Sequence, residues 1–209
     1  FTPEKLHAII DHAAKAGVDM FVLDDGWFGK RDQDNCSLGD WVPDRKKLPS
    51  GLKALVDRVH ALDMKFGLWF EPEMVSPDSD LYRAHPDWCL HVDGRPRPEA
   101  RQQLILDLSR TEVQDYIISA VSTVLADAGI DYVKWDMNRH MSDAFSAHLE
   151  NQGEFAHRYI LGLYEVLHRI FDSRPHVLLE SCSSGGNRFD LGMLCFSPQI
   201  WTSDDTDPV

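Results

Sequence analysis

The chain has 209 residues, 43% of them hydrophobic and 26% charged, which is typical of a soluble globular domain with a sizeable core. Acidic residues outnumber basic ones by 34 to 21 and no Lys/Arg-rich run occurs, so we expect no nucleic-acid partner. No apolar run is long enough to cross a bilayer, so we expect no membrane partner either.

The cysteines are too few and too scattered to form a disulfide framework. They include no Cys-x-x-Cys pair, and no Cys/His cluster has the spacing of zinc ligands. We therefore predict no metal and no other cofactor, with a hard cation held by clustered aspartates as the alternative. The cysteine pattern also favours a reducing, cytoplasmic location. The four positions are Cys36, Cys89, Cys182 and Cys195.

Apolar runs with strand character alternate with amphipathic helical patterns along the chain. Helix signals are clear at several ends: Thr2 and Pro3 begin the first helix, and Gly129 ends a long one. Helices are expected at 3–16, after Ser50 as far as Val59, at 111–128 and at 154–171, with a short helical piece at 188–194. Main strands are expected at 20–23, 65–70, around 130–135, at 176–179 and at 199–202, with a short extra strand at 104–107.

Each of the five expected main strands runs directly into charged residues, glycine or both. Residues two apart on a strand share a face, so Lys134 and Asp136 are predicted to point into the sheet's centre, opposite Val133 and Trp135. A single Lys-x-Asp would be interpreted as an ion pair that closes a strand, but repetition at several strand ends favours a functional site. The strand-end carboxylates are Asp24, Asp25, Glu71, Glu73, Asp136, Glu180, Asp204, Asp205 and Asp207.

Two parallel α/β architectures are compatible with this alternation of strands and helices. A doubly wound sheet usually carries a Gly-rich phosphate loop after its first strand, and no such motif occurs here. In a (β/α)₈ barrel the active site lies at the carboxyl ends of the strands, where the charged residues of this chain fall. Because a closed barrel needs eight strands, we predict a partial (β/α)₈ barrel, roughly strands two to six, forming one domain over 1–209 of a larger multidomain enzyme. A complete, smaller α/β domain is the alternative.

Carboxylates interleaved with tryptophans favour a sugar ligand, because carboxylates bind hydroxyl groups and indoles stack on the apolar face of a pyranose. Glycoside hydrolysis uses two carboxyl groups, one as nucleophile or base and one as acid. Lys134 would lower the pKa of Asp136 and keep it ionised, whereas Asp204 is crowded by Asp205 and Asp207, which favours its protonated form. The residue types leave Glu180 or Glu71 open as replacements for either. The tryptophans near strand ends are Trp27, Trp69, Trp135 and Trp201.

Five motifs follow one another along the chain. They are FVLDDGW at 21–27, GLWFEPEM at 67–74, YVKWDMNR at 132–139, ESC at 180–182 with the following glycine pair, and WTSDD at 201–205. In this order they resemble the catalytic barrel of bacterial α-galactosidases of glycoside hydrolase family 36, and the resemblance covers nearly the whole chain.

The resemblance implies roles for individual residues. Asp136 would be the nucleophile of a covalent galactosyl-enzyme, and Asp204 would be the general acid/base. Asp24 and Asp25 would bind galactose hydroxyls with the help of Lys134. The remaining substrate-binding residues would be Trp69 and Trp201 as walls, with Cys182 and Gly185 lining the pocket.

The predicted partner is a small α-galactoside, and the parent enzyme is expected to be a homo-oligomer. The family retains anomeric configuration, which implies carboxyl groups about 5–5.5 Å apart, whereas roughly 6.5–9.5 Å would indicate inversion. Alternatives are an α-N-acetylgalactosaminidase, a raffinose-synthase-like galactosyltransferase, or a non-catalytic carbohydrate-binding domain.

Overall fold

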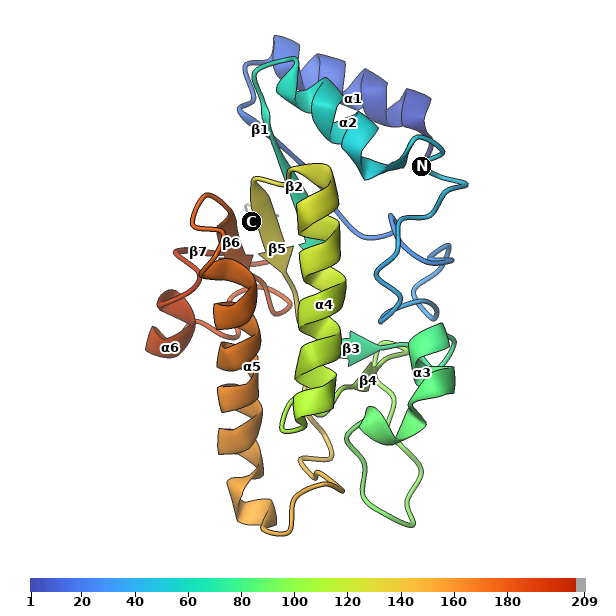
Figure 1. The fold of residues 1–209 in the computed structure, drawn as a ribbon, viewed down its shortest axis with the longest axis vertical. Helices are drawn as coiled ribbons and strands as arrows, with labels where there is room; N and C mark the ends of the chain where they lie inside the picture. The colour runs from blue at the N-terminus through green and yellow to red at the C-terminus, as the bar shows by residue number, and fades with distance from the viewer. Residues whose placement is uncertain (206–209) are drawn as a thin grey trace.

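The centre of the molecule is a five-stranded parallel sheet with strand order β1-β2-β5-β6-β7 (Figure 1). The computed structural model describes residues 1–205. The strands of this sheet are β1 (Met20–Leu23), β2 (Lys65–Phe70), β5 (Tyr132–Trp135), β6 (Leu178–Ser181) and β7 (Gln199–Ile200). Two further short strands, β3 (Met74–Val75) and β4 (Leu104–Ile105), form a separate antiparallel pair.

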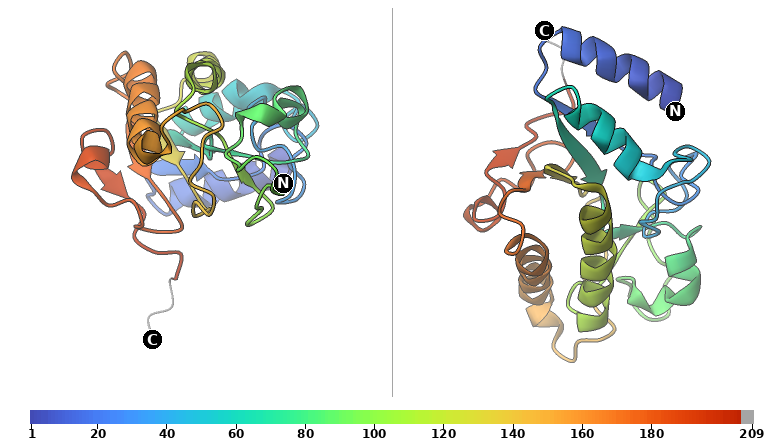
Figure 2. Two further views of the ribbon diagram at one scale, coloured as in Figure 1. Left: turned by 90° about the horizontal axis from the view of Figure 1, so that it is seen from below. Right: turned by 45° about the horizontal axis from the view of Figure 1, so that its top comes forward.

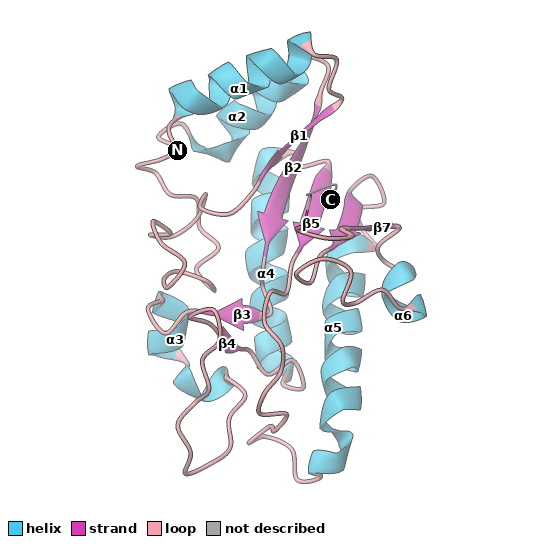
Figure 3. Cartoon of the chain, turned by 180° about the vertical axis from the view of Figure 1, so that it is seen from behind, coloured by secondary structure: helices cyan, strands magenta, loops and turns pink. Residues whose placement is uncertain are grey.

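Helices connect successive strands of the sheet. In the view from behind, the sheet lies in front of α4 and α5 (Figure 3). Helix α2 contacts β2 and α4, and α4 packs along α5, so the three helices follow one another in a row (Figures 1 and 2). The helices are α1 (Pro3–Lys15), α2 (Gly51–His60), α3 (Asp80–Ala84), α4 (Thr111–Ala128), α5 (Phe155–Phe171) and α6 (Leu191–Leu194), with single 3₁₀ turns at Pro86–Trp88 and Gln152–Glu154.

The predicted strand–helix alternation is confirmed, and so is the partial barrel. All neighbouring strands of the main sheet are parallel, and every crossover carries at least one helix. Among the described residues, β1 and β7 each pair on one side only, so the barrel is not closed. No helix within residues 1–205 combines the length and apolar character needed to cross a bilayer.

Several boundaries differ from the sequence-based prediction. Strand β6 begins at Leu178 rather than at residue 176, because the Val177 N–H closes a turn on the Arg174 carbonyl at 2.9 Å. Helix α6 begins only after Asp190, whose carboxylate accepts the N–H groups of the next turn. The expected extra strand at 104–107 is β4, but it pairs with β3 outside the main sheet.

The helix ends follow the predicted signals with one exception. Thr2 caps α1 by accepting the Lys5 N–H, and Gly129 ends α4 in the left-handed conformation with φ of 72°. Ser50 precedes α2 but makes no capping hydrogen bond through its side chain.

The close packing of α5 depends on Gly162. A Cβ atom at this position would lie 1.9 Å from the Leu108 carbonyl oxygen, which is backbone and cannot rotate away. We expect Gly162→Ala to lower the free energy of unfolding by about 1–3 kcal/mol, as overpacked sites do. Gly153→Ala is the control, since its new Cβ would meet only the flexible Asn151 side chain at 3.2 Å. Urea unfolding of both variants measures the difference, and equal losses would contradict this account of the packing.

Candidate active site

The carboxyl ends of the strands place the predicted site residues along one edge of the sheet. Lys134 on β5 is in register with Trp69 on β2 and with Glu180 on β6. Beyond β5, the Met137 N–H donates to the Cys182 carbonyl, which joins the loops that follow β5 and β6. Parallel pairing therefore gathers residues that are far apart in sequence, as the strand pattern predicted.

Asp136 directly follows β5 at this edge of the sheet. It is 5% exposed and is surrounded by hydrogen-bond donors. Its Oδ2 accepts the Trp69 Nε1–H at 2.9 Å and the Asn138 Nδ2–H at 2.6 Å, and its Oδ1 accepts the Met137 N–H at 2.9 Å. The Cys182 thiol also lies near enough to Asp136 for the two groups to interact. These partners donate, and none of them needs a proton from Asp136, which is the bonding pattern of an ionised carboxylate.

The Cys182 thiol stays protonated in this position. Burial raises its pKa to about 12, and the negative charge of Asp136 acts in the same direction. A protonated thiol beside a carboxylate is a weak donor rather than a nucleophile. Cys182 is thus suited to line the site and to steady Asp136.

Lys134 forms its ion pair with Asp24, not with Asp136. The Nζ–Oδ2 distance is 3.0 Å, and the ammonium also lies 5.0 Å from the centre of the Trp201 ring. Partial burial works against the charged lysine, but the hydrogen bond and charge of Asp24 leave the pKa of Lys134 above its ordinary value. Lys134 therefore connects the end of β1 with the segment after β7.

Asp204 belongs to that segment and is exposed. Its Oδ1 accepts the Trp201 Nε1–H at 2.8 Å, so the predicted acid/base and the predicted wall are directly bonded. Gly185 packs under this segment with φ of 91°, and a Cβ there would lie 3.0 Å from the Thr202 carbonyl oxygen. The close approach of two backbones explains why glycine is needed. Asp207, which was expected to crowd Asp204, lies outside the described residues.

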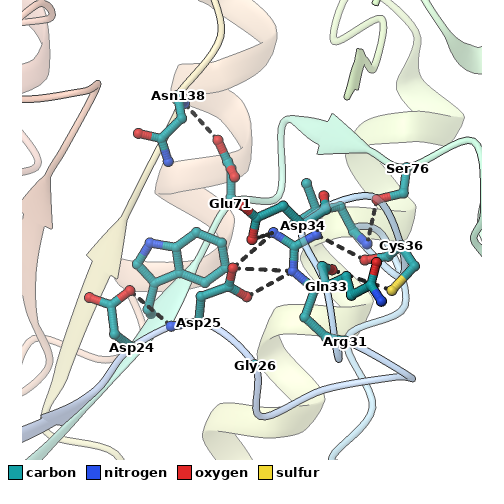
Figure 4. A network of polar contacts seen from close by, with 12 residues as sticks. Asp24, Asp25, Gly26, Arg31, Gln33, Asp34, Cys36, Glu71, Ser76 and Asn138 are labelled. Carbon is teal, nitrogen blue, oxygen red and sulfur yellow. Dashed lines mark hydrogen bonds and ion pairs between the residues drawn. The ribbon is translucent and has the colours of Figure 1, made fainter. Parts of the chain in front are cut away.

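Asp25 is held by an arginine for which the sequence predicted no role. Arg31 is buried and donates to Asp25 through Nε and Nη2, at 3.0 and 2.8 Å, while its Nη1 donates to the carbonyls of Asp34 and Cys36 (Figure 4). This two-point contact fixes the orientation of the Asp25 carboxylate. Arg31 follows β1 in a long irregular loop without periodicity, so no pattern marks it.

A cavity of about 220 Å³ is lined in part by Trp69 and Asn138, two of the residues that donate hydrogen bonds to Asp136. It is smaller than the roughly 300–1,000 Å³ typical of pockets for drug-sized ligands, so it suits a small polar ligand. Arg101 and Gln102 form part of its wall and both adopt left-handed backbone, with φ of 51° and 59°. Strain at consecutive non-glycine residues is characteristic of functional sites. The lining includes Asp25, Arg31, Trp69, Glu71, Arg101 and Asn138.

The strand-end glutamates Glu180 and Glu73 bind other side chains within the protein interior. Glu180 is buried and accepts the Tyr132 hydroxyl and the Gln199 amide, which ties β5, β6 and β7 together. Glu73 is fully buried and accepts the Trp135 indole and the Tyr159 hydroxyl, with Arg188 as its ion-pair partner at 2.7 Å. These arrangements hold the sheet, its loops and α5 together and argue against either residue as a catalytic group.

Two of the four tryptophans near strand ends are not available to a sugar. Trp27 and Trp135 are completely buried; Trp27 donates to the Trp69 carbonyl, and Trp135 packs against Phe171 of α5. Trp69 and Trp201 remain at the site. Within residues 1–205, no three His, Cys, Asp or Glu side chains come together in a way that could hold a metal ion.

The fold defines this chain as part of a (β/α) barrel, and the candidate site lies at the carboxyl ends of its strands. The chain belongs to the Melibiase family, whose model matches residues 1–209. This match confirms the family resemblance on which the residue roles were based.

Curated relatives cover the whole chain. It is 60% identical to α-galactosidase AgaA of Geobacillus stearothermophilus and 51% identical to α-galactosidase Mel36A of Lactobacillus acidophilus. In each comparison all of this chain aligns with 29% of the relative, so the chain spans less than a third of these proteins.

Solved structures agree with the fold. The crystal structure of the family 36 α-galactosidase AgaA has a TM-score of 0.96 at 59% identity, covering 99% of this chain and 29% of that one. The α-galactosidase of Lactobacillus brevis has a TM-score of 0.97 at 52% identity, covering 99% and 28%. Variants of AgaA were solved in complex with raffinose and with stachyose.

Proposed function

We propose that this chain is the central part of the catalytic domain of a retaining α-galactosidase that removes terminal α-linked galactose from small galactosides. The observation that carries the proposal is the Asp136 carboxylate, which accepts three hydrogen bonds at the end of β5 and whose donors Trp69 and Asn138 also line a small polar cavity. The relatives' activities and their complexes with raffinose and stachyose support the choice of substrate.

In the first step, an Asp136 oxygen attacks the anomeric carbon while Asp204 donates a proton to the departing oxygen. The C–O bond to the leaving group breaks as the bond to Asp136 forms, which gives a covalent galactosyl-enzyme. The donors around Asp136 aim its carboxylate, and the Lys134–Asp24 pair presents both signs of charge to the sugar hydroxyls.

In the second step, Asp204 takes a proton from water, and the water oxygen displaces Asp136 from the anomeric carbon. Two displacements restore the original configuration. We expect a carboxyl separation of about 5–5.5 Å between Asp136 and Asp204 in the galactose-bound enzyme.

We also propose that the parent protein is a cytoplasmic homo-oligomer with no cofactor. The composition and cysteine pattern support the location, and the absence of a need for a metal follows from the two-carboxyl mechanism.

Hydrolysis by the full-length enzyme tests the proposal. We expect turnover of an aryl α-galactoside, melibiose and raffinose, with α-galactose as the first product seen by proton NMR. A preference for the aryl α-N-acetylgalactosaminide, or galactosyl transfer to sucrose in place of hydrolysis, would favour the rival enzymes. Binding of galactosides without turnover, unchanged in Asp136→Asn, would indicate the non-catalytic domain.

A further inference from the structure

Within residues 1–205, Glu71 is a strand-end carboxyl group that faces the candidate nucleophile and has no cationic side chain hydrogen-bonded to it. It is 1% exposed, its Oε1 accepts the Asn138 main-chain N–H at 2.6 Å, and its Oε2 accepts the Gln103 Nε2–H at 3.1 Å (Figure 4 shows the first of these bonds). A second buried carboxyl beside Asp136 is costly unless one of the two is neutral.

Asn138 is held at three points. Glu71 accepts its main-chain N–H, the Ser184 hydroxyl lies 3.1 Å from its Oδ1, and its own Nδ2 donates to Asp136 at 2.6 Å. The Ser184 contact decides which end of the Asn138 amide faces Asp136, because a hydroxyl donating to Oδ1 leaves Nδ2 turned toward the carboxylate. Ser184 itself adopts left-handed backbone with φ of 49°, the kind of strain found where a side chain must be placed for function.

We infer that Glu71 and Ser184 are positioning residues, which clamp Asn138 so that its amide donates to the Asp136 carboxylate. This inference rests on the proposed function, since it assigns the clamp to the nucleophile of that reaction. Neither residue touches the reacting atoms in this role; both act through Asn138.

The protonation of Glu71 makes the clamp testable. Burial, and next the charge of Asp136, raises the pKa of Glu71 to about 8. Below that pH Glu71 is neutral, so replacing it removes no charge from the neighbourhood of Asp136.

The Gln103 amide can hydrogen-bond to either protonation state of Glu71. Its Nε2 donates to the ionised carboxylate, and after a 180° rotation of the amide its Oε1 accepts from the neutral carboxyl group. Any shift in the acid limb of the pH profile must then come through Asn138. Other charged or titratable groups near this pair remain in all the variants; they include Lys134, Arg31, Arg101, Cys182 and Arg188, together with Asp25 and Asp34, which line the same cavity as Glu71.

The experiment measures kcat/KM of the full-length enzyme for an aryl α-galactoside between pH 4 and 8. Glu71→Met keeps the size of the side chain but removes the acceptor for the Asn138 N–H. We expect a loss of about 10- to 100-fold at pH 6, because the released Asn138 would no longer hold its charge-assisted hydrogen bond to Asp136. We expect the acid limb to move to higher pH, since the carboxylate that acts as nucleophile would lose a hydrogen-bond donor. Glu71→Gln retains an acceptor for Asn138 and should stay within about threefold of the wild type.

Two comparisons separate a clamp from a general structural role. Asn138→Ala should shift the acid limb as Glu71→Met does, and the double variant should shift it no further, because both remove the same contact. Glu73→Gln is the matched control, a buried glutamate two positions away whose loss leaves Arg188 unpaired. It should lower the melting temperature without moving the acid limb upward.

The possible outcomes distinguish failure of the clamp from failure of the proposed function. An unmoved acid limb in Glu71→Met, or additive shifts in the double variant, would overturn the clamp while leaving the proposed function intact. No hydrolysis by the wild type would instead remove the proposed function. If Glu71→Met does not fold, Ser184→Ala decides, because Ser184 is exposed and its loss threatens the fold little. A smaller upward shift supports the clamp, and an unchanged limb overturns it.

Discussion

Replacing Asp136 with alanine is expected to lower kcat of the full-length enzyme by about 10⁴- to 10⁶-fold, the range seen when a covalent nucleophile is lost. Azide should restore part of the activity, because it fits the space left by the carboxylate and attacks the anomeric carbon directly. The product should be β-galactosyl azide, with inverted configuration, since only one displacement has occurred. Proton NMR of the azide product identifies the anomer.

The control for Asp136→Ala lies at the other end of the same strand. Asp131 precedes β5 and accepts the Phe66 N–H at 2.9 Å, a contact that joins β5 to β2 far from the site. Asp131→Asn should reduce stability but leave kcat within about threefold, as expected at the amino end of barrel strands. Activity in Asp136→Ala without azide, at more than a tenth of the wild-type rate, would exclude Asp136 as nucleophile.

Asp204→Asn is expected to lower kcat/KM for melibiose by about 10²- to 10⁴-fold, the usual contribution of a general acid. The loss in the first step should nearly vanish with a dinitrophenyl α-galactoside, because a good leaving group departs without a proton. Azide should now give α-galactosyl azide, since it attacks the galactosyl-enzyme already formed on Asp136.

The two azide products therefore distinguish the roles of Asp136 and Asp204. A loss in Asp204→Asn that is equally large for melibiose and the dinitrophenyl galactoside would contradict a proton-donor role. Exchange of the two anomers between the variants would mean that the assignments of nucleophile and acid/base are reversed.

The sequence was sufficient to predict the order of strands and helices and to identify the strand ends that carry charged residues. Asp24, Lys134 and Asp136 are placed by period-two alternation and by the rule that parallel strands end at a common edge, both of which are local properties. Helix boundaries such as Gly129 were equally visible, because a left-handed residue after an amphipathic run needs no tertiary contact.

Arg31, Glu71 and Arg101 could not be assigned in this way. Their roles depend on contacts between loops that have no periodicity, and on desolvation, which a list of residues does not reveal. The partner of Lys134 was also unpredictable: alternation placed it on the same face as Asp136, yet only the packed loops show that Asp24 takes the ion pair.

The sequence by itself determined the family, the parallel order of elements and the acidic edge, because these follow from repeating local patterns and from five ordered motifs. Tertiary structure alone decided which carboxyl groups are structural, as Glu73 and Glu180 are, and which face the cavity. The physical reason is that the protonation state and bonding of a carboxyl group depend on burial and on partners brought from distant segments, and neither is encoded in its immediate neighbours.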